Sequence, residues 1–170
     1  YNNGMNGGLF DELERKDSLN QVHNIKVEVD GINTNDWLKE NHSDLINKIK
    51  FIKTDTEGLD KEVLKTLAPL IKANKPVLMV EAFQSLTTEE IEDFYNVLKS
   101  FDYEIYDVSP LDNKTDCTGP LTREEFTHYI HKVVDNGNFF CFHKDEVHKY
   151  NLPTSIPGKT AAVIFGRNDG

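Results

Sequence analysis

The sequence predicts an α/β domain built around a mostly parallel sheet. Two kinds of segment alternate along the chain. Short segments that are apolar or alternating are typical of strands, and longer segments have apolar residues at helical spacing. Strands that alternate with helices favour parallel pairing. The continuous apolar run of residues 77–80 lies between two helical patterns, which is typical of a central strand buried on both faces.

The first elements follow from turn residues and periodicity. Residues 9–13 could form a helical turn, and residues 25–29 alternate like a half-buried strand that Gly31 ends. Thr34 or Asn35 can cap a helix. Its apolar residues are Trp37, Leu38, Leu45 and Ile46.

The middle of the chain carries the clearest strand–helix–strand pattern. Phe51 and Ile52 belong to a strand, and a helix follows over about residues 59–73. Lys75 and Pro76 end that helix. The buried strand of residues 77–80 comes next.

Two capping boxes mark the later helices. Thr87 and Glu90 stand at the spacing of a capping box ahead of a helix that reaches about Phe101, and Thr122 and Glu125 repeat the spacing ahead of another. Between and after these helices we expect strands over residues 103–108 and 139–142, and a loop over 109–120. Near the end lies a short apolar run, 161–165.

Length and composition limit the function classes. We treat residues 1–170 as one α/β domain or the C-terminal portion of one, with a loop or linker over 1–20, sheet and helices over 21–150 and a tail over 151–170. The net charge of −10, with basic residues interleaved among acids, argues against nucleic-acid binding and against an anionic membrane.

Targeting and cysteine usage favour the cytoplasm. No apolar run approaches the roughly 20 residues that cross a bilayer. Tyr1–Gly8 lacks the order of a signal peptide. Cys117 and Cys141 form no CxxC pair, so a reducing compartment fits better than a disulfide framework.

The candidate catalytic residues stand where the strand around Phe51 ends. Asp55 and Glu57 follow the strand directly, and ligands of open α/β sheets bind outside such carboxyl ends. Lys53 and Asp55 share one strand face, so an ion pair between them could keep Asp55 ionised. Either carboxylate could take a proton from a substrate, and two together could hold a divalent cation. Alternatively, Glu57 caps the following helix.

Two further residues are candidate substrate ligands. Glu81 ends the strand of residues 77–80, where it is either a substrate ligand or a polar residue leaving the core. His143, with His148, could line a substrate mouth near the last strand. His128 and His131 share a helix face but lack a third metal ligand, so we expect surface residues there. We assign no metal site.

With these residues in view, the chain resembles the FkbM-type methyltransferase family. That family carries a strand pattern DFIKIDVEGFE.EVL.G, then KP.L..E, then a late GY.I strand. The likeness covers about residues 25–108 and is weaker beyond. The matching segments are residues 51–58, 62–65, 75–81 and 103–105, and residues 27–33 and 36–38 resemble the segment leading to the family's TLDDLL helix.

The resemblance implies an S-adenosylmethionine-dependent O-methyltransferase with a Rossmann-like sheet, mostly parallel with the last strand antiparallel. The strand at Lys53 would be the fourth and residues 77–80 the fifth. Residues 103–108 and 139–142 would form the closing pair. The partner would be a small-molecule or glycan acceptor whose hydroxyl is methylated.

One part of the family pattern has no counterpart here. Family members bind the cofactor through a glycine-bearing loop after the first strand, an acid ending the second and a motif on the third. Gly4, Gly7 and Gly8 do not have the GxGxxG spacing. We therefore expect the sheet to lack its N-terminal half, with a missing N-terminal segment or a homo-oligomer completing it. The cofactor-binding residues stay unknown, and a non-catalytic, methyltransferase-like binding or assembly domain is the alternative function.

Overall fold

The computed structural model describes residues 30–83, 86–108, 116–132, 137–150, 152 and 161–162. The expected turn at residues 9–13 and strand at 25–29 lie outside these ranges. The N-terminal helices and the strand–helix–strand unit are α1 (Thr34–Asn41), α2 (Ser43–Ile46), β1 (Phe51–Lys53), α3 (Asp60–Thr66), α4 (Ala68–Asn74) and β2 (Val77–Ala82). The later elements are α5 (Thr88–Ser100), β3 (Tyr103–Val108), β4 (Asp116–Thr118), α6 (Arg123–Lys132), β5 (Gly137–His143), the 3₁₀ helix η2 (Val147–Lys149) and β6 (Ala161–Ala162).

The described strands form one mixed sheet in the order β1-β2-β5-β3-β4-β6. Only β1 and β2 pair in parallel, and the other four pairs are antiparallel. The expectation of a mostly parallel sheet was therefore wrong for this part of the chain. The reason is the position of β5, which lies between β2 and β3. It pairs antiparallel with both strands, so β2 and β3 do not form a parallel pair with each other.

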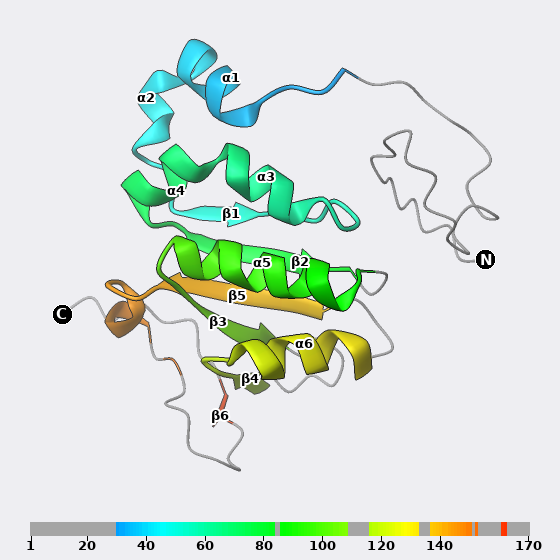
Figure 1. Ribbon diagram of the computed structural model, residues 1–170. Helices are drawn as coiled ribbons and strands as arrows, with labels where there is room; N and C mark the ends of the chain where they lie inside the picture. The colour runs from blue at the N-terminus through cyan, green and yellow to red at the C-terminus, as the bar shows by residue number, and fades with distance from the viewer. Residues whose placement is uncertain are drawn as a thin grey trace, which may run out of the picture.

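Helices α3 to α6 cover one face of this sheet. Figure 1 shows α5 and α6 in front of the strands, α3 and α4 beside β1, and α1 and α2 beyond the β1 edge of the sheet. The main core lies between helices α3 to α6 and the sheet, and alternate residues of β2, β3 and β5 point into it, among them Leu78, Val80, Ile105, Phe139 and Cys141. A smaller apolar cluster on the other face contains Tyr106 and Phe142, packed against the chain around η2.

Helix boundaries differ from the expectation at two places. The expected single helix over residues 59–73 is two helices, because Pro69 stands in the first turn of α4 and has no N–H to donate to the carbonyl of Lys65. The expected cap at Thr34 or Asn35 was also wrong. Asn33 caps α1, and its side chain accepts hydrogen bonds from the backbone N–H groups of Asn35 and Asp36.

Both capping boxes are confirmed. Thr87 Oγ1 accepts from Glu90 N while the Glu90 carboxylate accepts from Thr87 N, and Thr122 and Glu125 do the same ahead of α6. The strand over residues 103–108 is confirmed, whereas β2 and β5 extend beyond the expected ends and β4 lies within the expected loop. Among the described helices, none is both long and apolar enough to cross a membrane.

Candidate active site

The end of β1 presents Lys53 and Asp55 on the sheet face away from α3. Both side chains are about half exposed, whereas Thr54 between them is buried on the helix side. This alternation is the ordinary two-residue period of an extended chain. Lys53 Nζ donates a 2.7 Å hydrogen bond to Asp55 Oδ2, so the expected ion pair is confirmed.

The ion pair favours the charged form of Asp55. The hydrogen bond from Lys53 lowers the pKa of Asp55 below its ordinary value, and a hydrogen bond with Glu81 and the Lys53 charge act in the same direction. Partial burial opposes them. The same hydrogen bond raises the pKa of Lys53, which therefore keeps its positive charge. Asp55 is thus a carboxylate near neutral pH and can accept a proton.

A tight turn places Glu57. Glu57 has φ 53° and Gly58 has φ 100°, so two consecutive residues adopt left-handed backbone conformations. Glycine adopts this conformation at no steric cost, but a residue with a side chain rarely does. The following helix begins at Asp60 with Leu59 in the capping position. Glu57 is therefore not the helix cap, and its half-buried side chain stays with the end of β1.

Glu81 comes from the neighbouring strand. It is the next-to-last residue of β2 and is 7% exposed. The parallel register pairs Lys53 with Met79, so the chain two residues further on brings Asp55 alongside Glu81. Carboxylate oxygens of Asp55, Glu57 and Glu81 all lie within 4.8 Å of one another. The structure thus brings these three predicted residues together, with Lys53 beside them.

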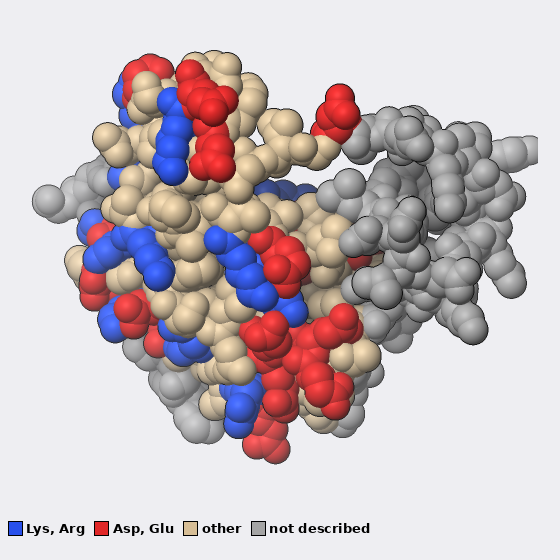
Figure 2. All heavy atoms as spheres, turned by 45° about the horizontal axis from the view of Figure 1, so that its top comes forward, with Lys and Arg blue, Asp and Glu red and all other residues tan. Residues whose placement is uncertain are grey.

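Three carboxylates at this spacing have two chemical uses. They can accept protons and hydrogen bonds from a hydroxylated substrate, and their hard oxygens are ligands of the type that binds Mg²⁺ or Ca²⁺. Asp55, Glu57 and Glu81 are the residues in the described part of the chain that could hold such an ion. Acidic side chains are also common on the face seen in Figure 2, where red atoms gather below the centre of the view.

Asp60 is a residue of this region that the sequence analysis did not single out. Its side chain is 1% exposed and accepts hydrogen bonds from Thr56 N at 3.1 Å, from Thr56 Oγ1 at 2.9 Å and from Glu81 N at 3.4 Å. The available signal was an aspartate in the first helical turn, directly after the carboxylates, but such residues are common at helix starts.

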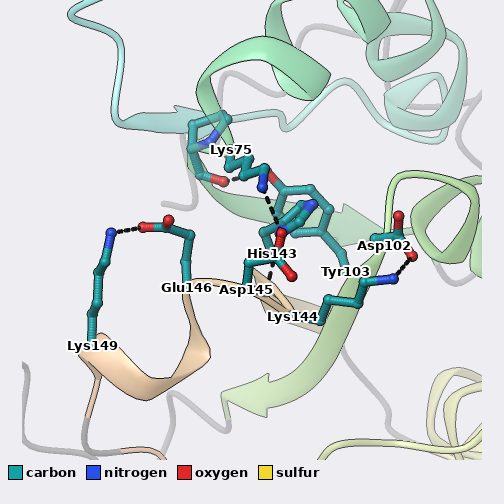
Figure 3. A network of polar contacts seen from close by, with 9 residues as sticks. Lys75, Asp102, Tyr103, His143, Lys144, Asp145, Glu146 and Lys149 are labelled. Carbon is teal, nitrogen blue, oxygen red and sulfur yellow. Dashed lines mark hydrogen bonds and ion pairs between the residues drawn. The ribbon is translucent and has the colours of Figure 1, made fainter.

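His143 lies at the other end of the sheet. Asn138 of β5 pairs with Glu81, and His143 is five residues further along the strand, about 17 Å at the usual rise per residue. Figure 3 shows His143 beside Tyr103 and the Lys75–Asp145 pair. The structure therefore does not bring His143 together with Glu81, and a shared role in holding one substrate stays a prediction that this geometry does not support.

Two other described histidines also lie outside the carboxylate group. His128 and His148 are exposed, as expected of His128, and the side chain of His131 is outside the described part of the structure. Neither His128 nor His148 contributes to the described cluster of metal-ligating atoms.

Comparison with known proteins identifies the family. A model of the Methyltransferase FkbM domain matches residues 7–105, more than half of the 170-residue chain. The match includes β1, β2, Lys53 and all three clustered carboxylates, and it begins upstream of the likeness seen in the sequence alone. No curated protein and no solved structure matches. Since the family match spans most of the chain, including the whole candidate site, the protein belongs to the FkbM methyltransferase domain family.

Proposed function

We propose that this chain carries the acceptor side of an S-adenosylmethionine-dependent O-methyltransferase that acts on a hydroxyl group of a sugar or another small molecule. The observation that carries the proposal is the convergence of three carboxylates within 4.8 Å at adjacent parallel strand ends, in a chain of a methyltransferase family. Ligands of open α/β sheets bind at such strand ends.

The side chains divide into distinct roles. Asp55, held ionised by Lys53, is the base that takes the proton of the acceptor hydroxyl. Glu81, fixed within β2 and nearly buried, orients that hydroxyl by accepting or donating a hydrogen bond. Glu57 reaches the same point from the turn and binds a second polar group of the substrate.

The charged side chains of the site suit a positively charged methyl donor. The described site presents three carboxylates with one lysine, and that lysine is engaged by Asp55. The carboxylates of this site would attract a positively charged group by Coulomb attraction. When bound, S-adenosylmethionine supplies a methyl group on a sulfonium sulfur, and the sulfur keeps the electron pair of the broken bond. Asp55 retains the proton that the acceptor oxygen loses.

The first test replaces the proposed base. Asp55→Asn keeps the size of the side chain but removes its basicity, so methyl transfer should fall by about 10²–10⁴-fold. The measurement is transfer of tritiated methyl from S-adenosylmethionine to a panel of sugars and hydroxylated small molecules, using the full chain. Affinity for S-adenosylhomocysteine, measured by calorimetry, should change little.

Asp93→Asn is the matched control. Asp93 also pairs with a lysine at 2.7 Å, but it lies on α5 away from the carboxylates, so its loss should leave transfer unchanged. Unchanged turnover in Asp55→Asn would remove the base from the mechanism. Absence of any heat or thermal stabilisation with S-adenosylmethionine or S-adenosylhomocysteine would favour a non-catalytic binding or assembly domain.

A further inference from the structure

One buried carboxylate joins the two strand ends that carry the candidate site. Asp60 Oδ2 accepts hydrogen bonds from the backbone N–H and the hydroxyl of Thr56, in the turn after β1. Its other oxygen, Oδ1, accepts from the backbone N–H of Glu81 in β2. A single side chain therefore holds both strand ends through groups that do not belong to the carboxylates themselves.

The position of Thr56 makes this link consequential. Thr56 lies between Asp55 and Glu57, so any displacement of its backbone moves both neighbouring carboxylates. Glu57 also adopts a left-handed backbone conformation, which is unfavourable for a residue with a side chain. Such a conformation persists only where interactions with neighbouring residues stabilise it. The two hydrogen bonds from Thr56 to Asp60 stabilise the backbone at the residue directly before Glu57.

We propose that Asp60 is a positioning residue that fixes the turn after β1 against β2 and thereby sets the mutual placement of Asp55, Glu57 and Glu81. It acts through Thr56 and the Glu81 backbone and does not touch the substrate. The inference deepens the proposed function and rests on it for its effect on methyl transfer, but the placement itself can be measured without an acceptor.

A simpler role for Asp60 makes a different forecast. A carboxylate in the first turn of α3 stabilises the helix through its dipole. In that case Asp60→Asn would lower the free energy of unfolding but leave the relative positions of the three carboxylates unchanged. The positioning role requires that the relative positions of the three carboxylates change as well.

The primary experiment follows carboxyl ¹³C NMR signals of the full chain during a pH titration. The carboxylate oxygens of Asp55 and Glu81 lie within 4.8 Å of one another, and acids this close titrate as a pair and not as two independent groups. Asp60→Asn should weaken this coupling, and so should Thr56→Val, which removes one hydrogen bond to Asp60 without removing a charge. Thr56→Ser, which keeps the hydroxyl, should retain the wild-type titration. Asp93→Asn is again the surface control.

Activity provides the second readout. With an acceptor from the methyl-transfer panel, Asp60→Asn should reduce kcat by about 10²-fold, the effect expected of a misplacement of about 1 Å, with a smaller change in KM. The loss should be much smaller when Glu81→Gln is already present, since the two residues act on one arrangement.

The outcomes separate the two proposals. Retained turnover in Asp55→Asn contradicts the proposed function, whereas the NMR titration still decides the role of Asp60. Unaltered coupling in both Thr56→Val and Asp60→Asn, or additive losses with Glu81→Gln, would overturn the positioning role. If Asp60→Asn does not fold, the comparison of Thr56→Val with Thr56→Ser decides the matter.

Discussion

The His143 side chain packs edge-on against Tyr103 at the end of β5 and lies near several charged groups. Its Nδ1 accepts a hydrogen bond from the backbone N–H of Asp145, so the ring is neutral in this arrangement. Burial lowers the pKa of His143 below its ordinary value, and the positive charges of Lys75 and Lys144 act in the same direction. The carboxylates of Asp145 and Asp102 oppose the shift.

This shift predicts a pH-dependent stability. Below about pH 6.5 the unfolded chain binds a proton at His143 that the folded chain resists, so folded stability should fall as pH decreases through that region and be fully present above it. Urea unfolding at several pH values between 5 and 7.5 measures the slope. His143→Gln should flatten it. His148→Gln, a change at an exposed histidine, should not, and an equal slope in all three proteins would contradict the assignment.

Residue types and strand position were enough to predict most of the candidate site. Asp55, Glu57 and Glu81 were found because acidic residues at adjacent parallel strand ends must lie close together. Asp60 was missed because its importance comes from the depth of its burial and from a partner 21 residues away, which no local pattern reveals. His143 lies far from Glu81 because the direction of β5 decides which end of the sheet it occupies, and residue type alone does not reveal that direction.

Among the elements, α5 depends on a well-defined start. The Thr87 hydroxyl and the Glu90 carboxylate satisfy each other's backbone N–H groups, which would otherwise lack partners within the helix. Thr87→Ala should lower the free energy of unfolding by about 1 kcal/mol, whereas Thr87→Ser should retain it. Equilibrium urea unfolding tests this, and an equally stable alanine variant would show that the box contributes nothing measurable.

Element boundaries were predicted well where a chemical signal marks them. The capping residues located the starts of α5 and α6, and alternation located β3. The division between α3 and α4 was missed, although Pro69 could have signalled it, because the apolar spacing continues across the break. The short strand β4 carries too few residues for a periodic pattern.

For the molecule as a whole, the aromatic core between α5, α6 and the sheet should dominate stability. The Phe126 ring is fully buried and contacts Phe94, Tyr95 and Phe139, with ring centroids 4.7–6.1 Å away. Phe126→Ala should therefore cost about 3–5 kcal/mol through lost burial and the cavity left behind. Phe51 is the matched control.

Phe51 is 51% exposed on β1, so Phe51→Ala should cost no more than about 1 kcal/mol. Both values come from urea unfolding at one pH. Comparable losses in the two variants would mean that the described packing does not determine stability.

The order of strands was the least predictable property of the whole molecule. Periodicity identifies each strand separately, but pairing between distant segments depends on the complete set of side-chain contacts. The family resemblance correctly implied an antiparallel last strand beside residues 103–108, and the structure adds that this strand also pairs with β2. Local patterns alone could not distinguish this arrangement from a continuous parallel sheet.

The insertion of β5 also bears on how the protein is made. During synthesis β2 and β3 leave the ribosome before β5, the strand that lies between them in the sheet. While α6 is being made, the edges of β2 and β3 that will pair with β5 therefore have no partner strand. Until then, the hydrogen-bonding groups along both edges are open to other chains, which is the situation that invites aggregation. Completion of this fold therefore depends on the late arrival of one aromatic-rich segment during synthesis.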